Sequence, residues 1–284
     1  MKKKILLATD FSKNAWNAIV YALELYKETE CDFYILNSFT ATEYLTDSLM
    51  VPEPGQDAYE DAKAESEDGL TEVSRMITFR EENNSKHNFT CISKFDNLLK
   101  AINEIVEEKD IELVVMGTKG ETNSFSLLFG SNAVDVMEKI RNCPVLVIPE
   151  EADSVYPKEI VFPTNYKTHI KRHELNHLVE IVKISKASIK ILHIAEGKEL
   201  DEQQINNQKL LQEYFEEIDY SFHLLSHMER SSAINCFVES RESDMIVFIN
   251  KKHTFFGSIF SQPLVKNITY HTKVPVLVLH DLRN

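Results

Sequence analysis

The chain has 284 residues, of which 43% are hydrophobic, and a formal net charge of −14. This length exceeds that of one typical small domain and predicts two domains, each with a hydrophobic core of its own. The acidic balance argues against a nucleic-acid groove and against an anionic membrane surface as partners, because both require a basic surface.

The first residues, MKKKILLATDF, place lysines before apolar residues as a signal peptide does. The apolar run stops at Ala8 and Asp10 follows, whereas a signal peptide needs roughly 7–15 apolar residues, so we expect a strand here. No segment approaches the ~20 apolar residues that span a bilayer. The four cysteines form no CxxC pair and fit no zinc or disulfide spacing, which favours a reduced, cytoplasmic protein. They are Cys31, Cys91, Cys143 and Cys236.

The first half of the chain alternates short apolar segments with amphipathic ones. The apolar segments are rich in β-branched residues without clean alternation, which predicts strands covered on both faces. The predicted strands are 4–8, 33–38, 89–93, 112–116 and 145–148, and the predicted helices lie near 13–28, 57–83, 96–109 and 131–141. This alternation predicts a parallel, doubly wound sheet with right-handed crossovers, in which ligands bind beyond the carboxyl ends of the strands.

The segment ATEYLTDSLMVPEPGQDAYEDAKAESED, residues 41–68, has no counterpart in the second half of the chain. Its front is irregular and contains prolines, and its back is acidic. We interpret it as a solvated loop. Because it follows the carboxyl end of the second strand, a flap over a binding site is the alternative.

Three of the seven glycines fall within VVMGTKGETNSFSLLFGSNAVDVM, residues 114–137. Gly117 and Gly120 follow a strand, where glycine permits positive φ and close approach of a ligand to the backbone. Gly130 and Ser131 open the next helix, whose unpaired amides and dipole attract anions. Together they predict a phosphate cradle, although the spacing is neither a Walker A loop nor GxGxxG. The alternative is a tight turn and a glycine that merely precedes a helix.

The second half repeats the element order of the first. PKEIVFPTNY, from Pro157, parallels KKILLATDFS, and ESDMIVFIN and KVPVLVLH parallel DIELVVMGT and CPVLVIP. An acidic, proline-bracketed linker at 149–157 separates the two copies. We therefore predict two tandem domains, 1–150 and 157–284, each a doubly wound, five-stranded parallel-sheet (Rossmann-like) domain.

The pattern G-x2-G-x9-G-S, followed by a helix and CPVLVI, resembles the universal stress protein family in its ATP-binding subgroup. The opening KKILLATDFS resembles the first strand and acidic corner of that family. The resemblance covers nearly the whole chain, as two tandem copies.

The resemblance implies an adenine-nucleotide site in the first domain, holding ATP, ADP or AMP, with Mg²⁺. The glycine loop and the following serine would wrap the phosphates and ribose, and the backbone at Ser38 would meet the adenine. Asp10 would line the site, and from the residues alone it is also read as a cap for the helix near Ser12. The chain has Asn37 where the family often has histidine. The implied site comprises Ala8, Thr9, Asp10, Ser38, Met116, Gly117, Gly120, Gly130, Ser131 and Asn132.

The second half has lost this pattern. Ile249 aligns with Gly117, and a β-branched residue is unfavourable at a left-handed corner. Lys252, Ser261, Gln262 and Asn165 align with Gly120, Gly130, Ser131 and Asp10. We therefore expect only the first domain to bind nucleotide. The last strand of the second domain is expected to pair with residues 143–150, as in the family, which gives a pseudo-two-fold pair within one chain. Association of two chains into a homodimer is left open.

The remaining patterns say less about function. His169, His173 and His177 recur every four residues and would share one helix face, where a zinc or copper site is weighed against a polar stripe. No G-x-S-x-G elbow is present, and Glu121 is the carboxylate nearest to the glycine loop. We expect slow ATP hydrolysis at most.

The sequence thus predicts a nucleotide-binding stress or signalling protein. An interaction scaffold of the same fold without nucleotide is the alternative from another class. An ATP-using enzyme is a weaker third reading, because it lacks an identifiable catalytic group.

Overall fold

The computed structural model describes residues 2–40, 53–81, 84–118, 131–152, 156–195, 199–250 and 273–280. Within them the first half of the chain forms strands that alternate with helices. The strands are β1 (Lys3–Ala8), β2 (Cys31–Phe39), β3 (His87–Phe95), β4 (Leu113–Gly117) and β5 (Val145–Ile148). The helices are α1 (Lys13–Leu25), α2 (Asp57–Arg80), α3 (Leu98–Lys109) and α4 (Ser131–Lys139).

The second half repeats this order. Its strands are β6 (Glu159–Thr164), β7 (Ser188–Ala195), β8 (Tyr220–Ser226), β9 (Met245–Asn250) and β10 (Val276–His280). Its helices are the 3-10 turn η2 (Arg172–Leu175), α5 (Asn176–Ser185), α6 (Glu202–Tyr214) and α7 (Arg230–Arg241). None of the helices described here is long and apolar enough to cross a membrane.

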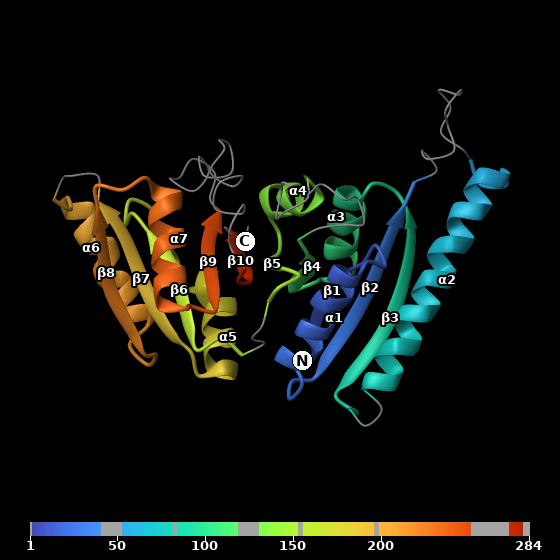
Figure 1. Ribbon diagram of the computed structural model, residues 1–284, viewed down its shortest axis with the longest axis horizontal. Helices are drawn as coiled ribbons and strands as arrows, with labels where there is room; N and C mark the ends of the chain where they lie inside the picture. The colour runs from blue at the N-terminus through green and yellow to red at the C-terminus, as the bar shows by residue number, and fades with distance from the viewer. Residues whose placement is uncertain are drawn as a thin grey trace.

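All ten of these strands lie in one sheet, in the order β3-β2-β1-β4-β5-β10-β9-β6-β7-β8 (Figure 1). The order within the second half mirrors that within the first. Neighbouring strands within each half are parallel. The predicted Rossmann-like α/β class, with two tandem doubly wound halves, is confirmed.

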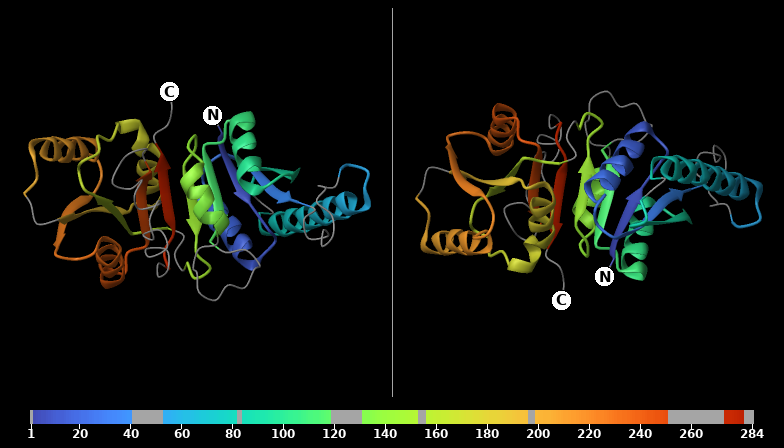
Figure 2. Two further views of the ribbon diagram at one scale, coloured as in Figure 1. Left: turned by 90° about the horizontal axis from the view of Figure 1, so that it is seen from above. Right: turned by 90° about the horizontal axis from the view of Figure 1, so that it is seen from below.

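The two halves meet where β5 and β10 run side by side at the centre of the molecule (Figure 2). This is an antiparallel pair, with Val147 opposite Val276 and Val145 opposite Val278. Each strand would otherwise be a sheet edge with unpaired backbone groups. Their pairing makes the sheet continuous from β3 to β8.

Helices cover both faces of the sheet, and an apolar core lies beneath each set (Figures 1 and 2). One core packs strand residues against α1, α2, α5 and α6, and the other packs them against α3, α4 and α7. Both cores contain residues of both halves. The strands are buried on both faces, as their continuous apolar runs predict.

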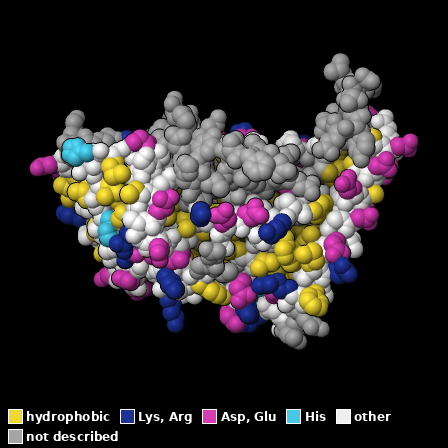
Figure 3. Space-filling view, viewed as in Figure 1, with side chains coloured by type: hydrophobic (Ala, Val, Ile, Leu, Met, Phe, Trp, Pro, Cys, Tyr) yellow, Lys and Arg dark blue, Asp and Glu magenta, His cyan; other side chains and the backbone are white. Residues whose placement is uncertain are grey.

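Helix α2 shows how the sequence divides between core and solvent. Its buried residues are Ala62, Ser66, Leu70, Val73 and Ile77, a spacing of three to four that places them on one face. Its acidic residues are exposed, and the space-filling view shows acidic side chains along that edge of the molecule (Figure 3). The acidic part of the extra segment, from Asp57, is thus the beginning of this helix, and residues 41–52 lie outside the described residues.

A partly buried ion pair links the halves away from the central strands. Lys3 Nζ of β1 lies 2.6 Å from Glu180 Oε2 of α5, and the Lys3 side chain is only 8% exposed. His177, one turn earlier on α5, places Nδ1 3.7 Å from the same carboxylate oxygen. Because a buried charge is costly without a partner, this contact favours one orientation of the halves.

Candidate functional site

The corner after β1 is the most structured part of the candidate site. Phe11 adopts a left-handed conformation, with φ of 66°, and its amide donates to Thr9 Oγ1 at 3.0 Å. The amide of Ser12 donates to Asp10 Oδ1 at 3.1 Å. Ser12 then caps α1 by accepting from the amide of Ala15. The expected capping role of Asp10 is therefore wrong, because Ser12 is the cap. The Asp10 side chain shapes the turn before it and stays exposed.

Gly117 serves close packing, and the positive φ expected at this position is wrong. It is the last residue of β4, and among the described glycines Gly55 alone has positive φ. A Cβ at Gly117 would lie 3.0 Å from the side chain of Asn14 and 3.1 Å from its backbone carbon. Asn14 Nδ2 in turn donates to Thr118 Oγ1 at 3.1 Å. The glycine thus lets the start of α1 approach the end of β4.

Helix α4 begins at Ser131, and both Ser131 and Asn132 are exposed in its first turn. The amides of a first helical turn have no partner inside the helix, so this end can receive an anion. Below this turn, Ala133 shares one core with Ala8 and Met116. Gly120 and Gly130 lie outside the described residues.

The strand ends that carry the predicted residues are neighbours in the sheet. β1 lies between β2, which carries Ser38, and β4, which ends at Gly117. The chain leaves β1 toward β2 on one side, and β4 lies on the other. This is the switch point at which open α/β sheets bind ligands. Ala8, Thr9 and Met116 are buried there, whereas Asp10 is exposed and Ser38 is partly so.

Sequence reasoning did not predict the contacts of two side chains that build this corner. Asn14 bridges α1 and β4, as described above. Asn37 of β2 donates from Nδ2 to the carbonyl oxygen of Thr9 at 2.8 Å. In the second half, His193 occupies the equivalent place, with Nδ1 3.0 Å from the carbonyl oxygen of Thr164. The available signal was the alignment of Asn37 with His193, since each side chain presents an N–H group to the carbonyl oxygen of the equivalent threonine, Thr9 or Thr164.

The corner after β6 repeats the backbone of the first corner. Tyr166 is left-handed, with φ of 56°, and its amide donates to Thr164 Oγ1 at 3.1 Å. The amide of Lys167 donates to Asn165 Oδ1 at 2.9 Å. An amide side chain therefore makes the same turn as the carboxylate of Asp10.

The second corner differs from the first because it is closed: its own tyrosine and side chains of β7 and α6 cover the turn. Tyr166 is 2% exposed and stacks on His193, with ring centroids 5.0 Å apart. From α6, Gln204 Nε2 donates to the carbonyl oxygen of Asn165 and Asn207 Nδ2 to that of Tyr166, both at 2.7 Å. In the first corner Phe11 is 37% exposed, and its ring lies against Gly69 of α2. At the position aligned with Gly117, Ile249 is buried in β9.

The three histidines do not share a helix face. His169 lies before η2, His173 is within that 3-10 turn, and His177 is within α5, because the α-helix starts only at Asn176. The expected stacking at intervals of four is therefore wrong. Within the described ranges, no three His, Cys, Asp or Glu side chains gather as a metal site.

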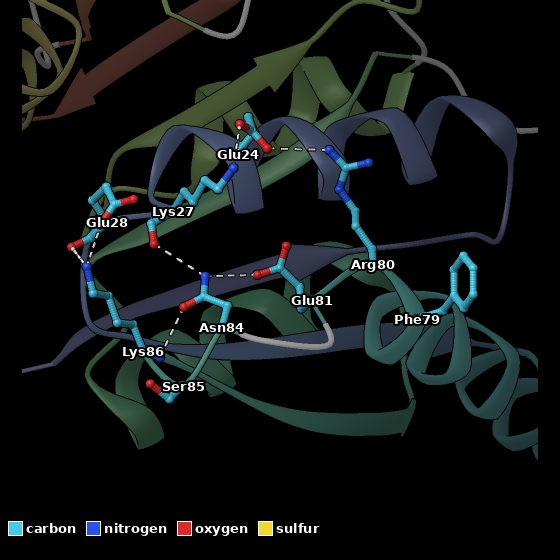
Figure 4. Close-up of a pocket in the computed structure, with 9 residues that line it drawn as sticks. All are labelled: Glu24, Lys27, Glu28, Phe79, Arg80, Glu81, Asn84, Ser85 and Lys86. Carbon is cyan, nitrogen blue, oxygen red and sulfur yellow. Dashed lines mark hydrogen bonds and ion pairs between the residues drawn. The ribbon is translucent and has the colours of Figure 1, made fainter.

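A pocket of about 620 Å³ lies at the other end of the strands from the candidate site, where β2 and β3 begin. Its lining comes from the ends of α1 and α2 and from the turn before β3 (Figure 4). The cations in it are paired with carboxylates: Lys27 and Arg80 each lie 3.5 Å from Glu24, and Lys86 lies 2.6 Å from Glu28. Because these cations are already paired with carboxylates, and because the pocket lies at the amino ends of the strands, it is an unfavourable site for a nucleotide.

Comparisons with known proteins agree with this architecture. The sequence model of the universal stress protein family matches residues 1–149. A universal stress protein of Methanocaldococcus jannaschii is 31% identical over 151 residues, which are 51% of this chain and 81% of that protein.

Several solved structures resemble the whole chain. The crystal structure of a universal stress protein from Archaeoglobus fulgidus has a TM-score of 0.72 at 17% identity and covers 98% of this chain and 96% of its own. A protein of unknown function from Pseudomonas aeruginosa has a TM-score of 0.63 at 13% identity, with coverage of 99% and 93%. At these identities the likeness concerns the fold alone.

Proposed function

Because the chain belongs to the universal stress protein family, we propose that it binds an adenine nucleotide at the carboxyl ends of β1, β2 and β4. The main support is the exposed Asp10 carboxylate at the switch point of the sheet, just beyond β1 and next to β4, which ends at Gly117. One oxygen of Asp10 holds the turn, and the second can accept hydrogen bonds from ribose hydroxyls.

The remaining contacts follow the same assignment. The first turn of α4, with Ser131 and Asn132, would receive the phosphates together with Gly120 and Gly130. The backbone at Ser38 would meet the adenine, and Ala8, Thr9 and Met116 would form the wall of the site. Mg²⁺ would be carried by the phosphates of ATP, since this ion is commonly bound through phosphates and waters.

We assign the nucleotide to the first of two proposed domains, 1–150 and 157–284. The closed corner at Tyr166 supports this assignment, because α6 side chains already bind the backbone carbonyl oxygens of Asn165 and Tyr166. The proposal includes hydrolysis that is slow at most, and a role in stress response or signalling through nucleotide occupancy. It places the protein in the cytoplasm, where ATP is available and the free thiols stay reduced.

The test is an Asp10→Asn variant, measured by equilibrium binding of ATP. Asn165 makes the same turn in the second half, so this substitution keeps the corner and removes only the carboxylate. We expect ATP binding to weaken about 10-fold, the loss of one charged hydrogen bond. Asn165→Asp is the matched control and should neither weaken binding nor add a second site. Equally weak binding by wild type and Asp10→Asn would discard the proposal.

A nucleotide-free interaction scaffold is the second candidate. The closed second corner favours it, since that half keeps the fold with the corner after β6 covered. Heat-denatured protein would then release no adenine nucleotide, as seen by mass spectrometry of the supernatant. The melting temperature would also be unaffected by ATP.

A further inference from the structure

The carboxyl-terminal end of α4, opposite its first turn, is held by the second half of the chain. Asn250, the last residue of β9, is 1% exposed. Its Nδ2 lies 3.2 Å from the carbonyl oxygen of Met137 and 3.4 Å from that of Glu138, both in the last turn of α4. By the alignment of the two copies, Asn250 stands where the first half has Thr118.

The contact is reciprocal. Arg141, just beyond α4, donates from its guanidinium to the backbone carbonyl oxygen of Asn250 at 2.9 Å. His280 of β10 pairs with Asn250 in the sheet register. Burial, reinforced by the Arg141 charge, lowers the pKa of His280 to about 3, so this imidazole is neutral at pH 7.

These contacts provide partners for carbonyl groups at the end of α4. The last carbonyl groups of a helix have no partner inside it, and α4 has nine residues, too few for a stable isolated helix. Asn250 satisfies two of those carbonyl groups, so the orientation of α4 depends on a residue of the other half. The opposite end of α4 begins at Ser131.

We propose that Asn250 is a positioning residue for the nucleotide site of the first half. It acts through α4, by fixing the helix whose first turn receives the phosphates. This inference rests on the proposed function. It gives the second half a task in binding, as a brace for the phosphate-binding helix, although its own corner is closed.

The test compares Asn250→Ala with Asn207→Ala in the full chain. Each variant removes one buried amide side chain that donates to backbone carbonyl oxygen, but Asn207 serves only the corner of the second half. Binding of ATP and of adenosine is measured at a temperature well below both melting transitions. We expect Asn250→Ala to weaken ATP binding 5- to 10-fold and to leave adenosine binding within twofold, because in the proposed site the first turn of α4 receives the phosphates, whereas the adenine lies at Ser38. Asn207→Ala should leave both affinities within twofold.

Arg141→Ala provides a second variant if Asn250→Ala fails to fold. It removes the reciprocal contact at a partly exposed position and should weaken ATP binding 2- to 3-fold, with adenosine again unaffected. Hydrogen exchange should be faster in α4 of both variants in the absence of nucleotide.

Each result that contradicts the expectation has its own consequence. Wild-type ATP affinity in Asn250→Ala and Arg141→Ala would overturn this inference and leave the proposed function standing. An equal loss of ATP and adenosine affinity, or the same loss in Asn207→Ala, would also overturn it, since the effect would then be general destabilisation. Absence of ATP binding by the wild type would overturn the proposed function and this inference together.

Discussion

Phe11 and Tyr166 show how single residues define both corners. A left-handed conformation costs an aromatic residue roughly 1–2 kcal/mol, so it persists only where its surroundings enforce it. Here the amide of each residue is held by the threonine two positions earlier, Thr9 or Thr164. The strained turn aims the following backbone into α1 in the first half, and exposes the Asp10 side chain on its outer side.

A second property of a single residue, the burial of His177, leads us to expect a loss of stability in acid. Burial, reinforced by the Lys3 ammonium, lowers its pKa to about 4 in the folded protein, against about 6.5 when unfolded. Between these pH values the unfolded chain binds a proton that the folded chain does not. The free energy of unfolding therefore falls as the pH drops from 6.5 toward 4, by roughly 2–3 kcal/mol for this group.

The check is urea unfolding of wild type and His177→Gln at pH 7.5 and 4.5. We expect the variant to lose about 2–3 kcal/mol less than wild type between the two conditions. His280 is retained in both proteins, so its own contribution cancels. Equal pH dependence of the two proteins would contradict the assignment.

At the scale of elements, α2 and the first corner restrict each other through Gly69 and Phe11. A Cβ on Gly69 would lie 2.5 Å from the Phe11 ring, although alanine is a better helix former by about 0.8–1 kcal/mol. We expect Gly69→Ala to stabilise a Phe11→Gly variant by 0.5–1 kcal/mol, because the ring is then absent and glycine suits the positive φ. The same change should fail to stabilise the wild type. Urea unfolding of the four proteins measures this coupling, and equal stabilisation in both backgrounds would contradict it.

Periodicity was sufficient to predict the elements because the buried strands are continuous apolar runs and the helices are amphipathic. The predicted strand 145–148 and the predicted helix start at 131 coincide with β5 and α4. The His169 to His177 pattern failed because a helix start depends on local capping: η2 and its Lys171–Glu174 contact occupy the region in which an α-helix was expected.

For the candidate site, the sequence indicated residue types but not contacts. A glycine after a strand indicates that a Cβ is not tolerated, but it does not identify the neighbour, which here is Asn14 from a segment about 100 positions earlier. Contacts over such separations depend on strand order and helix placement. The brace from Asn250 to α4 was missed for the same reason, since it requires the β5–β10 junction.

At the scale of the whole molecule, the halves share their cores. The strands form one hydrogen-bonded sheet, and each apolar cluster includes residues of both halves. Lys3 and Glu180 add a partly buried ion pair on one face, and Asn250 joins α4 on the other. Unfolding one half alone would expose the core of the other and leave Lys3 without its closest partner, so we expect a single cooperative transition.

Trp16 makes this expectation measurable, because it is the chain's single tryptophan and reports on α1 of the first half alone. Its fluorescence and the circular dichroism of the whole chain should give coincident urea transitions. Glu180→Gln should shift both to lower urea together, by about 1–3 kcal/mol, because it leaves the buried Lys3 ammonium with Glu112 at 3.9 Å. Glu28→Gln is the matched control: it breaks an ion pair of the same 2.6 Å length, but at the exposed surface, and should scarcely move either midpoint. A fluorescence transition that separates from the dichroism transition would show that the two halves unfold independently.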